Sequence, residues 1–204
     1  MLAEFNYPIV IAVSGKAFSG KDTFYELASS LAEELSAEYN CLVKVTRFAF
    51  GDAVKEAAKS LGWNGEKDER GRDGLIWVGN GAREHFNPNI WIDKVLEKMD
   101  AADSFSGVNI FIVTDCRYPN EVDSLRDYAG EFNFSSVRII GKNNPVAEIM
   151  TEEQLNSASE TALDSYNKFE CEFINDHARG KEPYRNFVKL LIRDALLWQR
   201  KCQK

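Results

Sequence analysis

The chain has 204 residues, of which 28% are charged and 44% hydrophobic, and its formal net charge is −7 at pH 7. These values predict one soluble domain that can bury a core of its own. The acidic balance argues against a protein that holds nucleic acid through its phosphates, because that requires a basic face. No apolar run exceeds strand length and no secretory leader is visible, so we expect a cytoplasmic protein without a membrane span.

Short apolar runs alternate with amphipathic stretches along the chain, and no repeat or linker divides it. Runs rich in β-branched residues predict strands at 9–13, 41–50, 108–114, 137–140 and 171–174. Apolar residues at helical spacing predict helices at 22–36, 52–61, 73–86, 90–100, 119–128 and 182–201. The charged stretch 66–72 is expected to be a loop. Strands that alternate with helices in one domain imply a parallel sheet covered on both faces.

The strongest motif lies between the first strand and the first helix, in residues 15–23, which we call the glycine loop. It reads Gly-Lys-Ala-Phe-Ser-Gly-Lys-Asp-Thr. A phosphate-binding loop needs this context, because successive backbone N–H groups wrap the phosphate oxygens at a helix N-terminus. Two glycines permit the turn, and Lys21 is expected to reach the β- and γ-phosphates. The motif therefore predicts ATP binding by Gly15, Lys16, Ser19, Gly20, Lys21, Asp22 and Thr23.

The residue after the lysine departs from the usual pattern. A Ser or Thr commonly stands there to hold Mg²⁺, whereas this chain has Asp22 followed by Thr23. Carboxylate and hydroxyl oxygens both suit magnesium, so either residue is a candidate ligand. We expect Asp22 to act directly or through water. The alternative is that Asp22 only caps the helix.

A second acidic position follows the strand at 108–114. Asp115 stands at the carboxyl end of that strand, where α/β sheets bind their ligands. It is predicted to contact the metal, or to act as a base that faces the acceptor phosphate. Arg117 is predicted to grip an anionic substrate with its guanidinium group. Because this short motif is not specific, a surface ion pair is the alternative.

Cationic side chains and tryptophans gather in the middle of the chain. As a group, the cations indicate a phosphorylated small substrate, although single members of a charged run are often only solvated; they are Lys67, Arg70, Arg72 and Arg83. The tryptophans are candidates to stack on a base, but large aromatic residues more often belong to the core; they are Trp63, Trp77 and Trp91.

Four motifs occur in one order over about residues 8–180. They are Ser14-Gly15-Lys16 with Ser19-Gly20-Lys21-Asp22-Thr23, Gly62-Trp63-Asn64-Gly65-Glu66-Lys67-Asp68, Asp115-Cys116-Arg117-Tyr118-Pro119-Asn120-Glu121 and Ala158-Ser159-Glu160-Thr161. Together they resemble the deoxynucleoside monophosphate kinases of tailed bacteriophages, within the P-loop nucleoside monophosphate kinase group.

The resemblance implies the α/β fold of the P-loop NTPases, a three-layer sandwich with a five-stranded parallel sheet in the order 2-3-1-4-5. Residues 1–204 would form one kinase domain, with a helical substrate-binding part at about 52–105 and a lid-like part at about 142–165. The implied activity is transfer of the γ-phosphoryl group of ATP, with Mg²⁺, to a deoxynucleoside monophosphate. Family analogy also favours a homodimer, located in the host cytoplasm if the protein is viral.

Matching positions carry the family's roles onto this chain. Catalysis would fall to Lys21, Asp115 and Arg117, and metal binding to Asp22, Thr23 and Asp115. Substrate binding would fall to Lys67, Arg70, Arg83, Arg117 and Glu160. One position departs from the pattern, because relatives often carry a histidine where this chain has Ser157. The lid-like part is also poor in arginine, which leaves Lys142 and Lys168 as candidates for its charge.

Two other functions fit the same loop. A different small-molecule kinase, similar to phosphomevalonate kinases, would have a pocket of basic and aliphatic groups without a base-stacking aromatic ring. A nucleotide-binding regulator would bind ATP without acceptor-dependent release of ADP. The sequence does not specify which bases are accepted, because that depends on the shape of the pocket.

Overall fold

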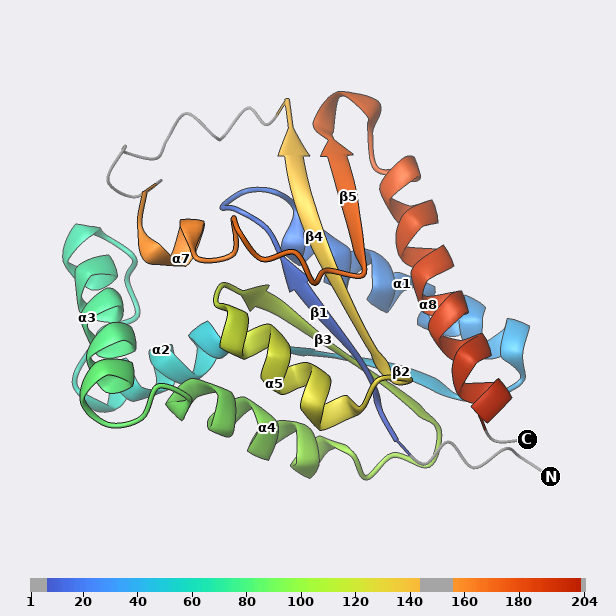
Figure 1. Cartoon of the computed structure of the whole chain (residues 1–204), viewed down its shortest axis with the longest axis horizontal. Helices are drawn as coiled ribbons and strands as arrows, with labels where there is room; N and C mark the ends of the chain where they lie inside the picture. The colour runs from blue at the N-terminus through green and yellow to red at the C-terminus, as the bar shows by residue number, and fades with distance from the viewer. Residues whose placement is uncertain (1–6, 144–155, 203–204) are drawn as a thin grey trace.

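The computed structural model describes residues 7–143 and 156–202 (Figure 1). Five parallel strands form one sheet in the order β2-β3-β1-β4-β5. The strands are β1 Ile9–Ser14, β2 Val43–Phe48, β3 Val108–Cys116, β4 Phe134–Lys142 and β5 Cys171–Asp176. The predicted α/β class and the predicted strand order are both confirmed.

Helices cover both faces of the sheet (Figure 1). One face carries α1 Lys21–Tyr39 and α8 Glu182–Cys202. The other face carries α2 Phe50–Ser60, α4 Ile90–Ala102 and α5 Pro119–Ala129. The helix α3 Glu69–His85 packs on α2 and α4 rather than on the sheet. The short helix α7 Ala158–Thr161 precedes β5, and the 3₁₀ turn η2 His177–Arg179 follows it.

The central strand β1 explains why the core has two halves. All six of its residues are buried, as its unbroken apolar run predicts for a strand covered on both faces. Ile9, Ile11 and Val13 pack against α1 and α8, whereas Val10 and Ala12 pack toward α4 and α5. Successive side chains of a strand point to opposite faces, so this one strand anchors both layers of helices.

The start of α3 differs from the prediction. The helix begins at Glu69, so the expected loop is wrong for its last four residues, 69–72. The Asp68 carboxylate accepts the N–H of Gly71 at 2.7 Å and thereby caps the helix. A run of charges concealed this capping signal. In β4 the strand also starts earlier than predicted, at Phe134.

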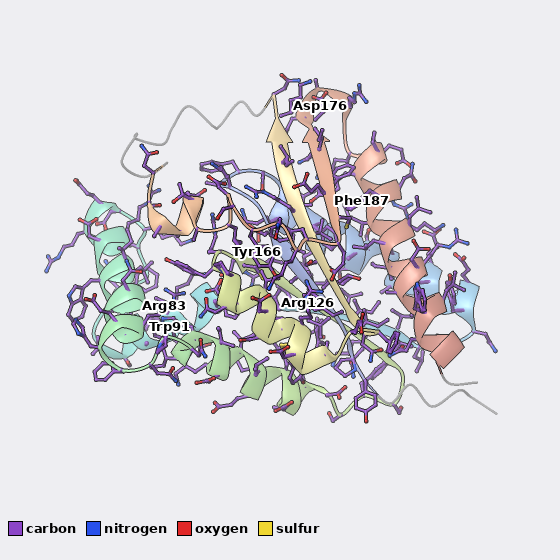
Figure 2. All side chains as sticks on the ribbon, viewed as in Figure 1. Arg83, Trp91, Arg126, Tyr166, Asp176 and Phe187 are labelled. Carbon is purple, nitrogen blue, oxygen red and sulfur yellow. The ribbon has the colours of Figure 1, made fainter. Side chains whose placement is uncertain are left out.

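The tryptophans separate into core and surface residues. Trp91 is buried, and its indole N–H donates to the Gly79 carbonyl at 2.9 Å, which makes it a core residue between α3 and α4 near Arg83 (Figure 2). Trp77 is 72% exposed. Trp63 donates to the Glu66 carbonyl at 2.8 Å and so stabilises the turn before α3.

The predicted helical part at 52–105 corresponds mainly to α2, α3 and α4. The predicted lid-like part at 142–165 falls partly outside the described residues, which omit 144–155. The roles of both parts stay predictions. None of the helices in the described ranges is both long and apolar enough to cross a bilayer.

The docking of α8 yields a prediction for stability. Leu196 is 1% exposed and packs in the core that α8 shares with α1, whereas Leu190 on the same helix is 58% exposed. Leu196→Ala is expected to lower the free energy of unfolding by about 2–5 kcal/mol, because it removes buried methyl groups and leaves a cavity. Leu190→Ala should change it by less than about 0.5 kcal/mol. Urea denaturation measures both, and equal losses would contradict this docking.

Candidate phosphate-binding site

The glycine loop takes a backbone shape that requires its glycines. Gly15 and Gly20 have φ values of 150° and 104°. A Cβ atom on Gly20 would lie 2.5 Å from the Asn175 amide nitrogen, and one on Gly15 would lie 2.5 Å from the Ile139 carbonyl oxygen. Larger side chains would therefore both strain the turn and clash with β4 and β5.

Two residues that are distant in the sequence form hydrogen bonds to the glycine loop. The Asn175 amide donates to the Ser19 carbonyl at 2.9 Å, and the Tyr184 hydroxyl donates to the Gly20 carbonyl at 2.9 Å. Both side chains are buried and come from β5 and α8. These two hydrogen bonds fix the positions of the Ser19 and Gly20 carbonyl oxygens. Local patterns in the sequence did not predict this role for either residue, because each contact joins positions more than 150 residues apart.

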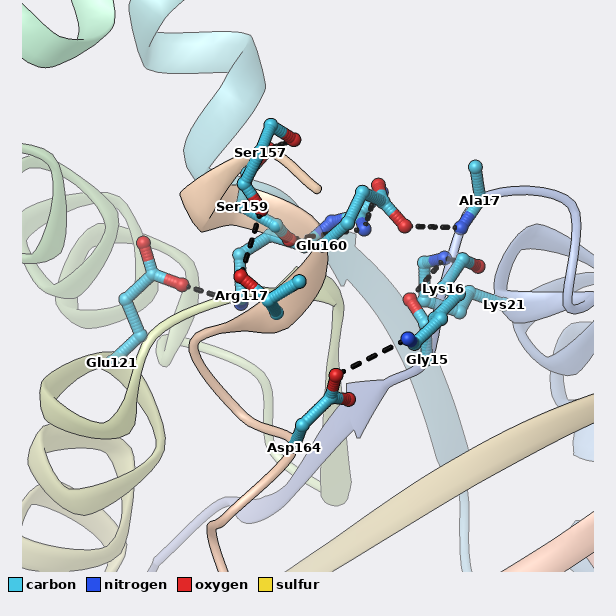
Figure 3. A network of polar contacts seen from close by, with 11 residues as sticks. Gly15, Lys16, Ala17, Lys21, Arg117, Glu121, Ser157, Ser159, Glu160 and Asp164 are labelled. Carbon is cyan, nitrogen blue, oxygen red and sulfur yellow. Dashed lines mark hydrogen bonds and ion pairs between the residues drawn. The ribbon is translucent and has the colours of Figure 1, made fainter. Parts of the chain in front are cut away.

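Lys21 lies folded over the loop. Its ammonium donates to the carbonyl oxygens of Gly15 and Lys16, at 2.7 Å each (Figure 3). Burial, together with the nearby Arg117 charge, lowers the pKa of Lys21 to about 8. Nearby carboxylates oppose this shift; they belong to Glu160, Asp22 and Asp115. The predicted lysine therefore lies where cationic and anionic groups meet.

Asp115 caps a helix. Its two carboxylate oxygens accept the backbone N–H groups of Phe50 and Gly51, at 2.9 and 2.8 Å, in the first turn of α2. Burial raises the pKa of Asp115, whereas these two donors act in the opposite sense. The carboxylate lies close enough to Lys21 to influence its charge. The metal-binding and catalytic roles of Asp115 stay predictions.

The oxygen donors available for Mg²⁺ lie at the start of α1. Asp22 is exposed in the first helical turn and Thr23 is half-buried. Within residues 7–143 and 156–202, no group of three or more His, Cys, Asp or Glu side chains is placed to hold a metal ion. This donor set fits an ion that takes most of its ligands from phosphate and water, as magnesium often does. Arg47 and Asp52 form an unpredicted ion pair, 2.7 Å long, at the same edge of the sheet.

The Glu121 carboxylate forms hydrogen bonds with two of the predicted arginines. One of its oxygens accepts the backbone N–H of Arg117 at 2.7 Å, and the other accepts the Arg83 guanidinium at 3.0 Å. The Arg83 guanidinium also lies 4.7 Å from the centre of the Tyr118 ring. Burial raises the pKa of Glu121 to about 7, against the effect of its donors. Although Glu121 stood in a motif, its positioning role was not predicted.

The Glu160 carboxylate bridges the glycine loop and Arg117 (Figure 3). One oxygen accepts the backbone N–H of Ala17 at 2.8 Å, and the other accepts the Arg117 guanidinium at 2.5 Å. Arg117 donates further to the Ser159 carbonyl at 3.3 Å. The Glu160 side chain is only 6% exposed. The structure thus brings Glu160, Arg117 and the loop together, while the predicted contact of Glu160 with substrate stays a prediction.

A second carboxylate of the same segment pairs with two more cations. Asp164 contacts the Lys16 ammonium at 3.2 Å and the Arg138 guanidinium at 2.7 Å. A small pocket lies between this segment and the glycine loop; its lining includes Gly15, Arg117, Arg138, Glu160 and Asp164. Arg138 and Asp164 were not predicted, because only the parallel pairing of β4 with β1 brings Arg138 level with Ser14.

The remaining predicted cations do not join this pocket. Lys67 and Arg70 are exposed, and Arg70 lines a different pocket between α2 and α3 that shares no residue with the first. Lys168 pairs with Asp123 on α5 at 3.7 Å, and Lys142 is exposed at the end of β4. Substrate binding by Lys67 and Arg70 stays a prediction.

Comparisons with known proteins do not identify a family for this chain. No family model and no curated protein matches the chain. Solved structures similar to it include a sugar kinase from a Janibacter species, with 18% identity, a TM-score of 0.47 and 94% of each chain covered. A gluconokinase from Sinorhizobium meliloti has 16% identity and a TM-score of 0.43, over 97% of this chain and 94% of that one. A shikimate kinase from Aquifex aeolicus has 15% identity and a TM-score of 0.43, over 91% and 95%.

The TM-scores of these three structures are all below 0.5. The resemblance to the phage deoxynucleoside monophosphate kinases is not confirmed by them.

The lowered pKa of Lys21 predicts a pH dependence of nucleotide binding. Phosphate favours the charged ammonium, and free Lys21 loses its proton above about pH 8. The affinity for ATP should therefore fall above that pH, by up to about tenfold per pH unit. Lys21→Arg should remove this fall, because a guanidinium stays charged. Titration calorimetry at pH 7, 8 and 9 measures the slope, and the same slope in both proteins would exclude Lys21 as its origin.

Proposed function

We propose that this protein is an ATP-dependent kinase that phosphorylates deoxynucleoside monophosphates to diphosphates. The observation that carries the proposal is the meeting of the glycine loop and Arg117 at one buried anion position. A strand–glycine loop–helix unit with Lys21 suits the phosphates of a nucleotide donor. Arg117 and Arg138 line the pocket at this position. Arg83 is held by Glu121, which also accepts the Arg117 backbone N–H. These cations favour an acceptor that itself carries a phosphate.

The preference for a nucleotide acceptor has two supports. The four motifs resemble those of phage deoxynucleoside monophosphate kinases. In addition, Tyr118 places an aromatic ring beside Arg83 and directly after Arg117, where an acceptor similar to phosphomevalonate would need only basic and aliphatic groups. A homodimer and a cytoplasmic location are proposed on analogy alone.

Phosphoryl transfer needs positioning and charge rather than covalent help from the protein. An oxygen of the acceptor phosphate attacks the γ-phosphorus of ATP, the bond to the β–γ bridging oxygen breaks, and ADP leaves. The loop N–H groups and Lys21 would hold the donor phosphates, while Arg117 would orient the acceptor phosphate. Mg²⁺, held by Asp22 or Thr23 with Asp115 near, would neutralise charge on the phosphate oxygens. An ionised acceptor phosphate needs no protein base.

Release of ADP from Mg·ATP, coupled to a spectroscopic readout, tests the proposal with each deoxynucleoside and ribonucleoside monophosphate as acceptor. We expect release that depends on a deoxynucleotide. Lys21→Ala should lower the turnover roughly 100-fold or more, because it removes a charge placed at the migrating phosphoryl group. Lys181→Ala, at an exposed lysine before α8, serves as the control and should leave turnover unchanged.

Three other outcomes would redirect the assignment. Near-normal turnover in Lys21→Ala would exclude the glycine loop as the donor site. Release with a phosphorylated aliphatic acceptor, offered in the same assay, and with no nucleotide would favour a different small-molecule kinase. Binding of ATP without release for any acceptor would favour a nucleotide-binding regulator.

A further inference from the structure

We propose that the Glu160 carboxylate occupies a phosphoryl-binding position and that phosphorylated ligands bind by displacing it. This inference deepens the proposed function and rests on the same site, since it names the place that a phosphoryl group takes. Glu160 would then act as an internal competitor, which is the opposite of a residue that helps to bind substrate.

The donors around Glu160 are those that a phosphoryl oxygen uses. One is a backbone N–H of the glycine loop, from Ala17, and the other is the Arg117 guanidinium. Loop N–H groups and guanidinium groups both bind phosphate oxygens and carboxylates with similar geometry. The two Glu160 oxygens take these donors at 2.8 and 2.5 Å in a nearly buried setting. A phosphoryl group and the carboxylate cannot both accept full hydrogen bonds from these two donors.

Other cations of the pocket are also paired with a carboxylate of the chain itself. Asp164, four residues after Glu160, neutralises Lys16 and Arg138 on the other side of the small pocket. The segment 157–164 thus supplies two carboxylates, Glu160 and Asp164, which Figure 3 shows. The other charged groups that line the pocket are cationic; they belong to Lys16, Arg117 and Arg138. The Lys21 ammonium donates its hydrogen bonds to two carbonyl oxygens rather than to either carboxylate, although the Glu160 charge acts on it.

The competition has a measurable consequence. The donors that an incoming phosphate needs are already bound to a carboxylate of the same charge. Only those protein molecules in which the Glu160 side chain has moved away from these donors can therefore bind the phosphate with all of its contacts. The observed dissociation constant is then the intrinsic one divided by the fraction of molecules with the position free. Removing the Glu160 charge should therefore tighten phosphate binding.

Pyrophosphate is a suitable probe, because it carries phosphoryl groups without a base or an acceptor. We expect Glu160→Gln to bind pyrophosphate about tenfold more tightly than the unmodified protein in titration calorimetry, because the competitor held most of the sites. The glutamine keeps an acceptor for Ala17 and the size of the side chain, and thermal unfolding checks that the variant folds.

Glu56→Gln is the matched control. It makes the same substitution outside the pocket, because the partner of Glu56 is the Lys98 ammonium on α4, at 2.7 Å, rather than a group of the glycine loop. The affinity of this variant for pyrophosphate should change by less than about threefold, as for an exposed ion pair. Equal gains in both variants would reduce the effect to general electrostatics and overturn the proposal. Unchanged or weaker binding in Glu160→Gln would also overturn it.

A second measurement needs no variant. In the unmodified protein, saturating pyrophosphate should speed amide hydrogen exchange in a peptide that covers residues 158–164, because the segment loses its contacts. Slower exchange there would overturn the proposal. Tighter pyrophosphate binding in Glu160→Gln without any acceptor-dependent ADP release would keep the phosphoryl position and reject the kinase. Acceptor-dependent release without tighter binding would do the reverse.

Discussion

The parallel pairing of β1 with β3 is the constraint on which the candidate site depends. Its register sets Ser14 beside Cys116, so the glycine loop leaves one strand next to the point where Arg117 follows the other. The carboxyl ends of parallel strands share one edge of a sheet, and both strands are buried there. A chain without this pairing would hold a phosphate loop and a cluster of arginines at unrelated places.

Groups far along the chain then hold this junction in shape. Asn175 and Tyr184 fix the carbonyl oxygens of the glycine loop, while Glu121 fixes the backbone of Arg117. These side chains are buried and hydrogen-bonded, so they keep their partners in place before any ligand arrives. Loop N–H groups and an arginine that are held in this way would lose little entropy on binding a phosphate, as the proposed phosphoryl transfer requires.

Predictions from the sequence succeeded where a local pattern carries the information and failed where a distant contact decides. The apolar run at 9–13 and the glycine loop after it identified β1 and α1, and a family resemblance supplied the strand order that the structure confirms. The predicted start of α3 was wrong, because Asp68 is one carboxylate among many charged residues. Only the hydrogen bond that it accepts from the Gly71 N–H marks it as the helix cap. The contact between Ala17 and Glu160 joins residues 143 positions apart, so no spacing rule reveals it.

Lys21 and Arg117 are proposed to act on one transferred phosphoryl group. A double-mutant cycle tests this directly, with kcat/KM for phosphoryl transfer from Mg·ATP measured for the unmodified protein, Lys21→Ala, Arg117→Ala and the double variant. We expect an interaction free energy of about 0.5–3 kcal/mol, because residues that act on one reacting group and influence each other's charge do not act independently. Losses that add within about 0.3 kcal/mol would show that the two residues act independently and would contradict a shared site.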